Sequence, residues 1–399
     1  MVVPSRFFSW GCQPSAKADN AAVLLDGSRS QINGMAMVTG ELRVEVGLGE
    51  RAYEIIIADG LLAAVGGDLA ATGLARRWVV VADDRVAGLF GEELRAGLTA
   101  AGLNTEILTF PHGEASKNLA TVAELASGLA RLGLDRGDGL IALGGGVSGD
   151  ICGFLASIYM RGIPFVQVPT SLLAQVDSSV GGKTGVDIPE GKNLVGTFYQ
   201  PRRVYIDPGV LAALPAVEML NGLAEIIKYG VIYDADFFRL LEEQRPAILD
   251  RRQEVLAAVI KRCCEIKAAV VAADERESDW RRILNFGHTL GHAVEAASGY
   301  TLAHGLAVAI GMVLVAEIAV EKELWSREEA QRLRRLLTDY GLPTTVPADL
   351  DSARIKSYLK TDKKSVAGRP CFVLPTTIGR VTITSEVEEE LIDRALAGC

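Results

Sequence analysis

Three of the four histidines in this 399-residue chain, His288, His292 and His304, lie close together in the sequence. Imidazole nitrogens bind zinc and exchange protons near neutral pH. The segment 281–297 has a helical period, and its polar residues are expected on one face of one helix: Arg281, Asn285, His288, His292 and Glu295. Because histidine and asparagine are unusual on a solvated face, we interpret this stripe as part of a site rather than as surface.

A metal site needs further ligands, and Glu225 is the strongest candidate. It lies in a mostly apolar helical segment, where an unpaired carboxylate would be costly. Two histidines and one carboxylate would leave one coordination position open, as catalytic zinc sites require. The alternative is a surface ion pair between Glu225 and Lys228. Spacing does not decide which two histidines would bind the ion, because His288 and His292 at i and i+4 could also chelate together.

A second candidate site is the glycine-rich segment 141–150, IALGGGVSGD. An apolar strand leads into it, a helix is expected over 151–159, and Gly144, Gly146 and Gly149 satisfy GxGxxG. Glycines let the backbone approach a pyrophosphate, and the helix N-terminus offers free N–H groups. The alternative is a tight turn without a ligand. The strand before the motif and the helix after it favour a dinucleotide site.

Three aspartates accompany this segment. Asp150 follows the last glycine and could bind the cofactor or cap the helix. Asp83 and Asp84 end an earlier strand, where an adenosine ribose hydroxyl often meets a carboxylate. These residues extend the predicted dinucleotide site.

Lysines mark a third candidate site in the polar segment 177–193, which is expected to be a loop. Lys183 and Lys192 lie beside glycines, Asn193 follows, and Arg161 precedes the strand that leads there. Glycines bring the backbone close to a ligand, and lysines supply point charges for phosphate. A solvated surface loop is the alternative. The paired lysines in matching glycine contexts favour a phosphate site.

The strands and helices that position these residues can be predicted from short apolar runs and from helical periods. Strands are predicted as an edge pair within 41–56 and at 78–82, 105–110, 139–143 and 165–169. Strands that alternate with helices, such as 119–134, predict a parallel sheet. Later, helices are predicted at 219–231, 235–243, 252–273, 281–297, 306–324 and 327–339. We therefore predict an N-terminal α/β dinucleotide-binding domain over 41–216 and an all-α C-terminal domain over 217–399. They follow an N-terminal extension over 1–40 that is expected to have no structure of its own.

Composition limits the function classes. The net charge of −9 argues against a nucleic-acid surface, and we find no uninterrupted apolar run long enough to predict a membrane span. The six cysteines form no CxxC pair, which is typical of a reduced, cytoplasmic protein. The first 34 residues are rich in Gly, Pro, Ser and Asn and have no clear period, as expected of a tail or an upstream start.

Several ordered stretches together resemble the 3-dehydroquinate synthase family. They are GGGVSGD, YMRGIPFVQVPTSLLAQVDSSVGGKTGVD, GKNLVGTFYQP, LAEIIKYG and NFGHTLGHAVE. The resemblance extends from about Val44 to the C-terminus. It implies an NAD-binding α/β domain joined to a helical domain, with the active site between them, and it implies a homodimer.

The resemblance also implies roles for individual residues. The implied metal ligands, for Zn²⁺ or Co²⁺, are Glu225, His288 and His304. The implied contacts of substrate hydroxyls and carboxylate are Asp177, Lys228, Lys267 and Arg281. The implied phosphate contacts are Lys183, Asn193, Asn285, His292 and Arg161, and the resemblance allows Arg161 to reach across a dimer. One of Lys363 and Lys364 matches a further substrate lysine. The implied NAD contacts are Glu114, Lys117, Gly144, Gly145, Gly146, Val147, Ser148, Gly149, Asp150, Thr170, Ser171, Lys183 and Lys192, and Asp83 joins them.

The implied reaction converts 3-deoxy-D-arabino-heptulosonate 7-phosphate to 3-dehydroquinate and phosphate, with catalytic NAD and a divalent metal. This is a phosphorus–oxygen lyase of the shikimate pathway, which leads to aromatic amino acids. Two alternatives are another sugar-phosphate cyclase and, less favoured, a metal-dependent polyol dehydrogenase of the same fold. The partner expected in every case is a small molecule, not nucleic acid or membrane.

Overall fold

The computed structural model describes residues 40–359 and 370–398. The described residues belong to one compact unit, Thr39–Cys399. The predicted extension over 1–40, except for Gly40, lies outside the described residues, as do Lys363 and Lys364.

A seven-stranded sheet forms the first half of the fold, in the order β1-β2-β9-β6-β5-β3-β4. Its strands are β1 Leu42–Val46, β2 Tyr53–Ile57, β3 Trp78–Asp83, β4 Thr105–Phe110, β5 Gly139–Gly144, β6 Phe165–Pro169 and β9 Arg203–Ile206. β1 and β2 pair antiparallel, and all other pairs are parallel. The predicted edge pair and the four predicted parallel strands are therefore confirmed.

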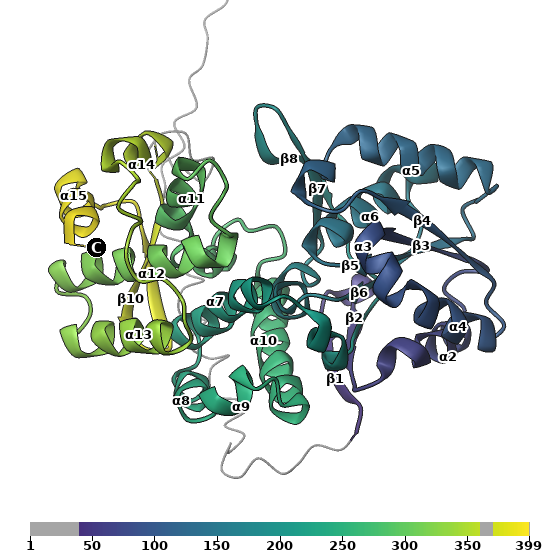
Figure 1. Cartoon of the computed structure of the whole chain (residues 1–399), viewed down its shortest axis with the longest axis horizontal. Helices are drawn as coiled ribbons and strands as arrows, with labels where there is room; N and C mark the ends of the chain where they lie inside the picture. The colour runs from purple at the N-terminus through teal and green to yellow at the C-terminus, as the bar shows by residue number, and fades with distance from the viewer. Residues whose placement is uncertain (1–39, 360–369, 399) are drawn as a thin grey trace, which may run out of the picture. The chain divides into compact units, whose positions relative to one another are not determined.

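Helices cover both faces of this sheet (Figure 1). Their bounds are α2 Leu61–Thr72, α3 Asp84–Val86, α4 Glu92–Ala100, α5 Leu119–Arg131 and α6 Gly146–Ile158. Successive side chains of a strand point to opposite faces. Accordingly Val79 and Val81 pack in the cluster that contains α5 and α6, whereas Trp78 and Val80 pack with α2 and α4. Because β3 to β6 run parallel, the loops after these strands lie at one edge of the sheet.

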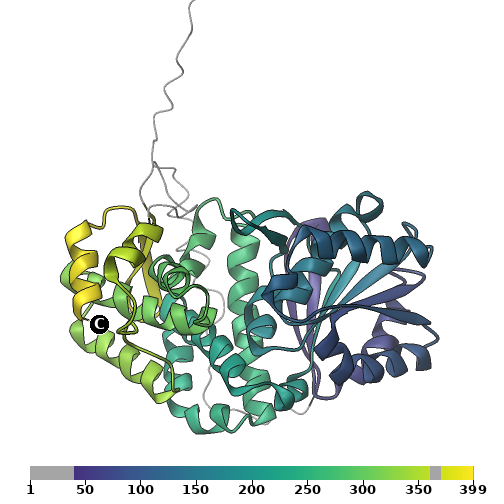
Figure 2. The same cartoon turned by 45° about the horizontal axis from the view of Figure 1, so that its top comes forward.

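Helices dominate the second half of the chain (Figure 2). They are α7 Ala216–Ile232, α8 Ala235–Glu243, α9 Arg245–Leu249, α10 Gln253–Ala273, α11 His288–Ala297, α12 His304–Glu321, α13 Arg327–Asp339, α14 Ser352–Leu359 and α15 Glu389–Gly398. The predicted fold class is confirmed, and the helical half additionally carries an antiparallel hairpin of β10 Phe372–Thr377 and β11 Arg380–Thr384. The domain boundary at 216/217 stays a prediction.

One hydrophobic core joins the helices to the β1–β2–β9 edge of the sheet. Ile55 and Val204 belong to the same buried cluster as Val259 of α10 and Leu314 of α12. Helix α12 is long and apolar enough to cross a membrane by length and composition, but 72% of its apolar window is buried inside the fold. Its apolar character is therefore explained by its place in the core.

Two local predictions were wrong. The single helix over 281–297 is a 3-10 helix, Trp280–Asn285, followed by α11, and Gly287 separates them at φ +76°. A Cβ at Gly287 would lie 2.6 Å from Met312 Cγ, so close packing on α12 also requires glycine there. The expected loop over 177–193 contains the strand β7 Lys183–Ile188, which pairs with β8 Gly191–Phe198.

Candidate active site

The predicted dinucleotide residues gather at the carboxyl ends of four neighbouring strands. Asp83 ends β3, Glu114 and Lys117 follow β4, the glycine loop follows β5, and Thr170 and Ser171 follow β6. The chain runs from β4 back past β3 to β5, so the strand order reverses between β3 and β5. Such a switch point is where open parallel sheets bind ligands.

The glycine loop is shaped by contacts that leave no room for side chains. At Gly144, φ is +150° and a Cβ would lie 2.2 Å from Ser148 Oγ. The carbonyl of Gly144 accepts a hydrogen bond from Thr170 N at 2.9 Å, and Ser148 Oγ lies 3.5 Å from Asp83 Oδ2. Ser171 Oγ accepts from Ala174 N at 3.3 Å.

Helix α6 begins directly after this loop, at Gly146, and Gly145 is its N-cap residue. The first turn therefore directs free N–H groups from residues such as Val147 towards the switch point. This arrangement can hold an anionic pyrophosphate without any basic side chain.

Lys117 makes several polar contacts beside the glycine loop. Its Nζ lies 2.6 Å from Asp150 Oδ2 and donates to Asn193 Oδ1 at 2.6 Å. Burial alone would lower the pKa of Lys117, but Asp150 and Glu114 outweigh burial and raise it. Asn193, predicted at the phosphate, thus lies among the predicted NAD residues. Its backbone N–H also donates to Asp187 Oδ1, at 2.6 Å.

The predicted metal ligands meet in the helical half. Glu225 of α7 is fully buried, and its Oε1 lies 3.5 Å from His288 Nε2 and 3.4 Å from His304 Nε2. Neither oxygen of Glu225 makes a hydrogen bond of standard geometry, although Lys228 forms a buried ion pair with it. The alternative of a surface pair is therefore wrong. His292 lies close by, with ring centroids 5.2 Å from His288 and 5.5 Å from His304.

The spacing of these atoms fits a metal ion. Zinc binds imidazole nitrogen at about 2.0–2.1 Å and carboxylate oxygen at about 2.0–2.2 Å, so tetrahedral ligand atoms lie roughly 3.4 Å apart. The two Nε2-to-Oε1 distances match that separation. A second grouping is also present, because ligand atoms of His288, His292 and His304 lie within 4.8 Å of one another. The assignment to Glu225, His288 and His304 stays a prediction.

Close helix contacts bring these residues together. His304 is the first residue of α12. The backbone N–H of the next residue, Gly305, donates a hydrogen bond to Asn221 Oδ1. Asn221 lies one turn before Glu225 on α7. A Cβ at Gly305 would lie 2.2 Å from the carbonyl oxygen of Asn221. A Cβ at Gly311 would likewise lie 2.0 Å from the carbonyl oxygen of Gly287, next to His288.

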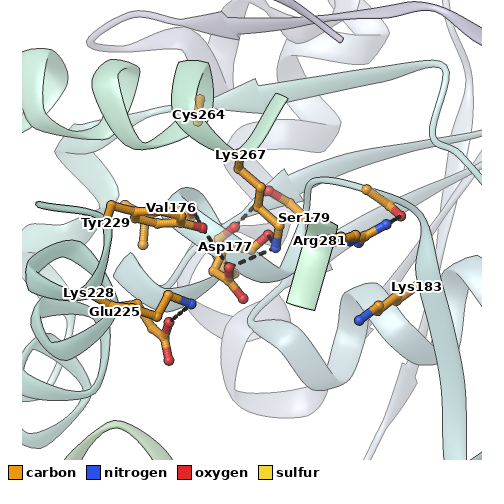
Figure 3. Close-up of polar contacts among 12 residues, drawn as sticks. Val176, Asp177, Ser179, Lys183, Glu225, Lys228, Tyr229, Cys264, Lys267 and Arg281 are labelled. Carbon is orange, nitrogen blue, oxygen red and sulfur yellow. Dashed lines mark hydrogen bonds and ion pairs between the residues drawn. The ribbon is translucent and has the colours of Figure 1, made fainter. Parts of the chain in front are cut away.

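A buried charge cluster adjoins Glu225 (Figure 3). Asp177 Oδ1 accepts from Tyr229 Oη at 2.7 Å and lies 2.8 Å from Lys267 Nζ. Burial alone would raise the pKa of Asp177, but Lys267 and then Lys228 outweigh burial, and the pKa lies well below its usual range. Burial lowers the pKa of Lys267 to about 8, although Asp177 opposes this shift. Tyr229 was missed from the sequence, where it reads as an apolar helix position.

Arg281 is buried beside this cluster, with 1% of its surface exposed. Both of its terminal nitrogens lie 3.2 Å from the carbonyl oxygen of Gly181, and Nη1 also donates to the carbonyl of Glu275. The predicted substrate contact thus holds two backbone segments together in this structure.

The predicted phosphate residues are only partly brought together. Lys183 forms an ion pair with Glu277, and Asn285 Nδ2 donates to the same carboxylate at 2.8 Å. Glu277 was missed, because a glutamate in the polar run DERES looks like solvated surface. Arg161 is exposed beyond the far end of α6, whereas Asn193 is joined through Lys117 to Asp150 near the start of that helix. These two predicted phosphate residues therefore lie apart within the same chain.

Lys192 connects the two halves. Its Nζ lies 3.0 Å from Glu295 Oε1 and 3.8 Å from Glu114 Oε1. Glu295 in turn lies 3.3 Å from His304 Nδ1, whereas His288 Nδ1 faces the carbonyl oxygen of Phe286 at 3.1 Å. The predicted cofactor and metal residues are therefore connected by a continuous set of polar contacts.

Comparison with known proteins identifies the family. Family models described as 3-dehydroquinate synthase N-terminal and C-terminal match residues 107–221 and 222–365. The chain is 45% identical over 357 residues to the 3-dehydroquinate synthase of Thermodesulfovibrio yellowstonii, covering 89% of this chain and 99% of that protein. The chain belongs to the 3-dehydroquinate synthase family. Another family member, from Pelobacter propionicus, is 48% identical over 348 residues, covering 87% of this chain and 97% of that protein.

A solved structure extends this family relationship. The 2-epi-5-epi-valiolone synthase of Streptomyces hygroscopicus, solved with NAD⁺ and Zn²⁺ bound, is 31% identical and superposes with a TM-score of 0.80. The match covers 87% of this chain and 96% of that protein. The fold assembled here is thus shared with a cyclase that binds the same two cofactors the sequence predicts.

Proposed function

We propose that this protein is a 3-dehydroquinate synthase, which converts 3-deoxy-D-arabino-heptulosonate 7-phosphate to 3-dehydroquinate and phosphate. The observation that carries the proposal is the convergence of Glu225, His288 and His304 at tetrahedral ligand spacing beside a buried charge cluster. Sequence identity of 45% and 48% over nearly the full length of two 3-dehydroquinate synthases supports the choice of substrate. Structures of the same fold solved with NAD⁺ and Zn²⁺ or Co²⁺ support NAD and zinc or cobalt as cofactors.

The residues present fit both cofactors. Glu225, His288 and His304 would hold the metal, and the N-terminus of α6 with Thr170 and Asp83 would hold the dinucleotide. When bound, the metal would supply Lewis acidity towards substrate hydroxyls, and NAD⁺ would supply a reversible hydride acceptor.

The charged side chains would bind and orient the substrate. The raised pKa of Lys228, which Glu225 causes against the effect of burial, keeps a cation beside the metal ligands. Lys267, with a pKa of about 8, is the second cation, and Asp177 can accept hydrogen bonds from hydroxyls. Fixed charges in a buried site position a polyhydroxy acid without reorganisation during the reaction.

The phosphate is assigned to Lys183, Asn285, His292 and Asn193. Lys183 and Asn285 already share one carboxylate, that of Glu277, so both side chains are directed towards an anion. Arg161 would complete this group from the second subunit of a homodimer, because within one chain it lies at the opposite end of α6 from Asn193. We further propose a cytoplasmic location, in keeping with the absence of a CxxC pair.

The decisive experiment is NMR of the product formed from the heptulosonate phosphate with substoichiometric NAD⁺, together with phosphate detection. We expect one carbocyclic product, one phosphate per substrate and no net NADH. Net NADH from a polyol without phosphate release would overturn the proposal in favour of a dehydrogenase. A panel of sugar phosphates tests the other alternative, since the valiolone synthase has the same fold.

A further inference from the structure

The two ring nitrogens of His304 face two different carboxylates. Nε2 lies 3.4 Å from Glu225 Oε1, and Nδ1 lies 3.3 Å from Glu295 Oε2. A neutral imidazole has one N–H and one lone pair, and a carboxylate at one nitrogen accepts the N–H. Glu295 at Nδ1 therefore leaves the Nε2 lone pair facing the proposed metal position.

Glu295 itself is oriented by a lysine from the other half of the chain. Its Oε1 lies 3.0 Å from the Nζ of Lys192, a residue 103 positions away on β8. The Glu295 side chain is only 9% exposed, and a carboxylate this buried needs a countercharge. The ring of Tyr300 lies 4.5 Å from the same Nζ and favours its cationic form. The two oxygens of Glu295 are thus divided between one cation and one imidazole.

His288 provides an internal contrast. Its Nδ1 faces the backbone carbonyl oxygen of Phe286 at 3.1 Å, which no substitution removes. The Nδ1 of His304, in contrast, faces a side chain that can be exchanged.

We propose that Glu295 and Lys192 are positioning residues for the metal, so that the hairpin of the dinucleotide half sets metal affinity through His304. Neither residue touches the metal: Glu295 fixes the imidazole, and Lys192 fixes the carboxylate. This inference rests on the proposed metal site, and it adds a dependence of that site on β8.

The test measures zinc affinity and the rate of zinc release to a chelator in the full-length protein. Glu295→Gln is expected to weaken zinc binding about 10- to 100-fold, the usual effect of removing such a partner. Lys192→Met is expected to weaken it about tenfold, and Lys192→Arg, which keeps the charge, to restore most of the affinity. In the Glu295→Gln background, Lys192→Met should add little, because both act through one contact.

Lys183→Met is the matched control. Lys183 begins the other strand of the same hairpin and also pairs with a glutamate of the helical half, Glu277, but it does not contact Glu295. Its substitution should leave zinc affinity unchanged. Thermal unfolding of each apo-protein checks that the variants fold.

The outcomes separate the two proposals. A parent protein that binds no stoichiometric zinc would overturn the metal site and with it the proposed function. A parent that binds zinc, with Glu295→Gln and Lys192→Met binding equally tightly, would overturn this inference alone. An equal loss of affinity in Lys183→Met would also overturn it, because any contact between the halves would then have the same effect.

Discussion

The proposed dinucleotide site at the sheet edge is formed mainly by backbone groups, whereas the proposed metal site among the helices is formed by side chains. At the sheet edge, backbone groups of residues 144–147 face the proposed dinucleotide position, and glycine is needed at 144 because Ser148 Oγ leaves no room for a Cβ. In the helical half, buried side chains such as Glu225, Lys228 and Lys267 form the site, and each depends on its neighbours for charge compensation. The first site is fixed by chain topology, whereas the second is fixed by mutual pairing.

Glu225→Ala tests this pairing and should have the largest effect. It removes a proposed metal ligand, so phosphate release should fall by roughly a thousandfold or more. It also leaves Lys228 buried without its partner, which should cost about 3–5 kcal/mol of stability. Zinc stoichiometry, phosphate release and urea unfolding measure the three effects.

A double variant separates the two losses. Glu225→Ala with Lys228→Met removes both charges, so stability should largely return while zinc binding stays lost. Zinc bound by Glu225→Ala at the level of the parent would contradict the ligand assignment.

Gly311→Ala tests the helix contact beneath the metal cluster. The new Cβ would lie 2.0 Å from the carbonyl oxygen of Gly287, so α11 and α12 must separate, at a cost of about 1–3 kcal/mol or more. Zinc affinity should fall with stability, because His288 and His304 lie on these two helices. Gly67→Ala in α2 is the control: its Cβ meets open space, and a small gain of about 0.5–1 kcal/mol is expected. Equal stability changes in both variants, measured by urea unfolding, would disprove the packing argument.

The pH dependence of Lys267 should give the smallest effect near neutrality. Burial lowers its pKa to about 8, so the ammonium form predominates below that pH and is lost as the pH rises. If the cation binds the substrate, kcat/KM should fall about tenfold per pH unit above 8. Lys267→Arg keeps its charge and should shift this fall to higher pH. A flat profile to pH 9.5 in the parent would show that the cation is not required.

Strands β3 to β6 could be predicted from the sequence because each run ends at or next to a Gly, Asp or Pro at the sheet edge. Strand β9, which lies between β2 and β6, was not predicted. Asn285 and His288 were predicted on one helix face, and this failed because Gly287 adopts a left-handed conformation that only its packing on α12 demands. Tertiary contacts of this kind leave no local periodicity.

The residues of the candidate site likewise include some that could be predicted from the sequence and some that could not. The meeting of Glu225, His288 and His304 was expected from the family resemblance, and their convergence is present in the structure. Glu277 could not be found, because its neighbours Arg276 and Ser278 are polar and only the fold brings it to Lys183. When two polar segments far apart in the sequence pair in the fold, the sequence of neither segment predicts the pair.

The hydrophobic cluster shared by Ile55, Val204, Val259 and Leu314 constrains how this protein can be divided. Severing the chain at the junction before α7 would leave the β1–β2–β9 edge stripped of the helices that shield it from water. Neither fragment would hold a complete interior of its own. A chimera of two relatives would therefore need to take the β1–β2–β9 edge and the helices that cover it from the same parent, although these segments lie far apart in the sequence.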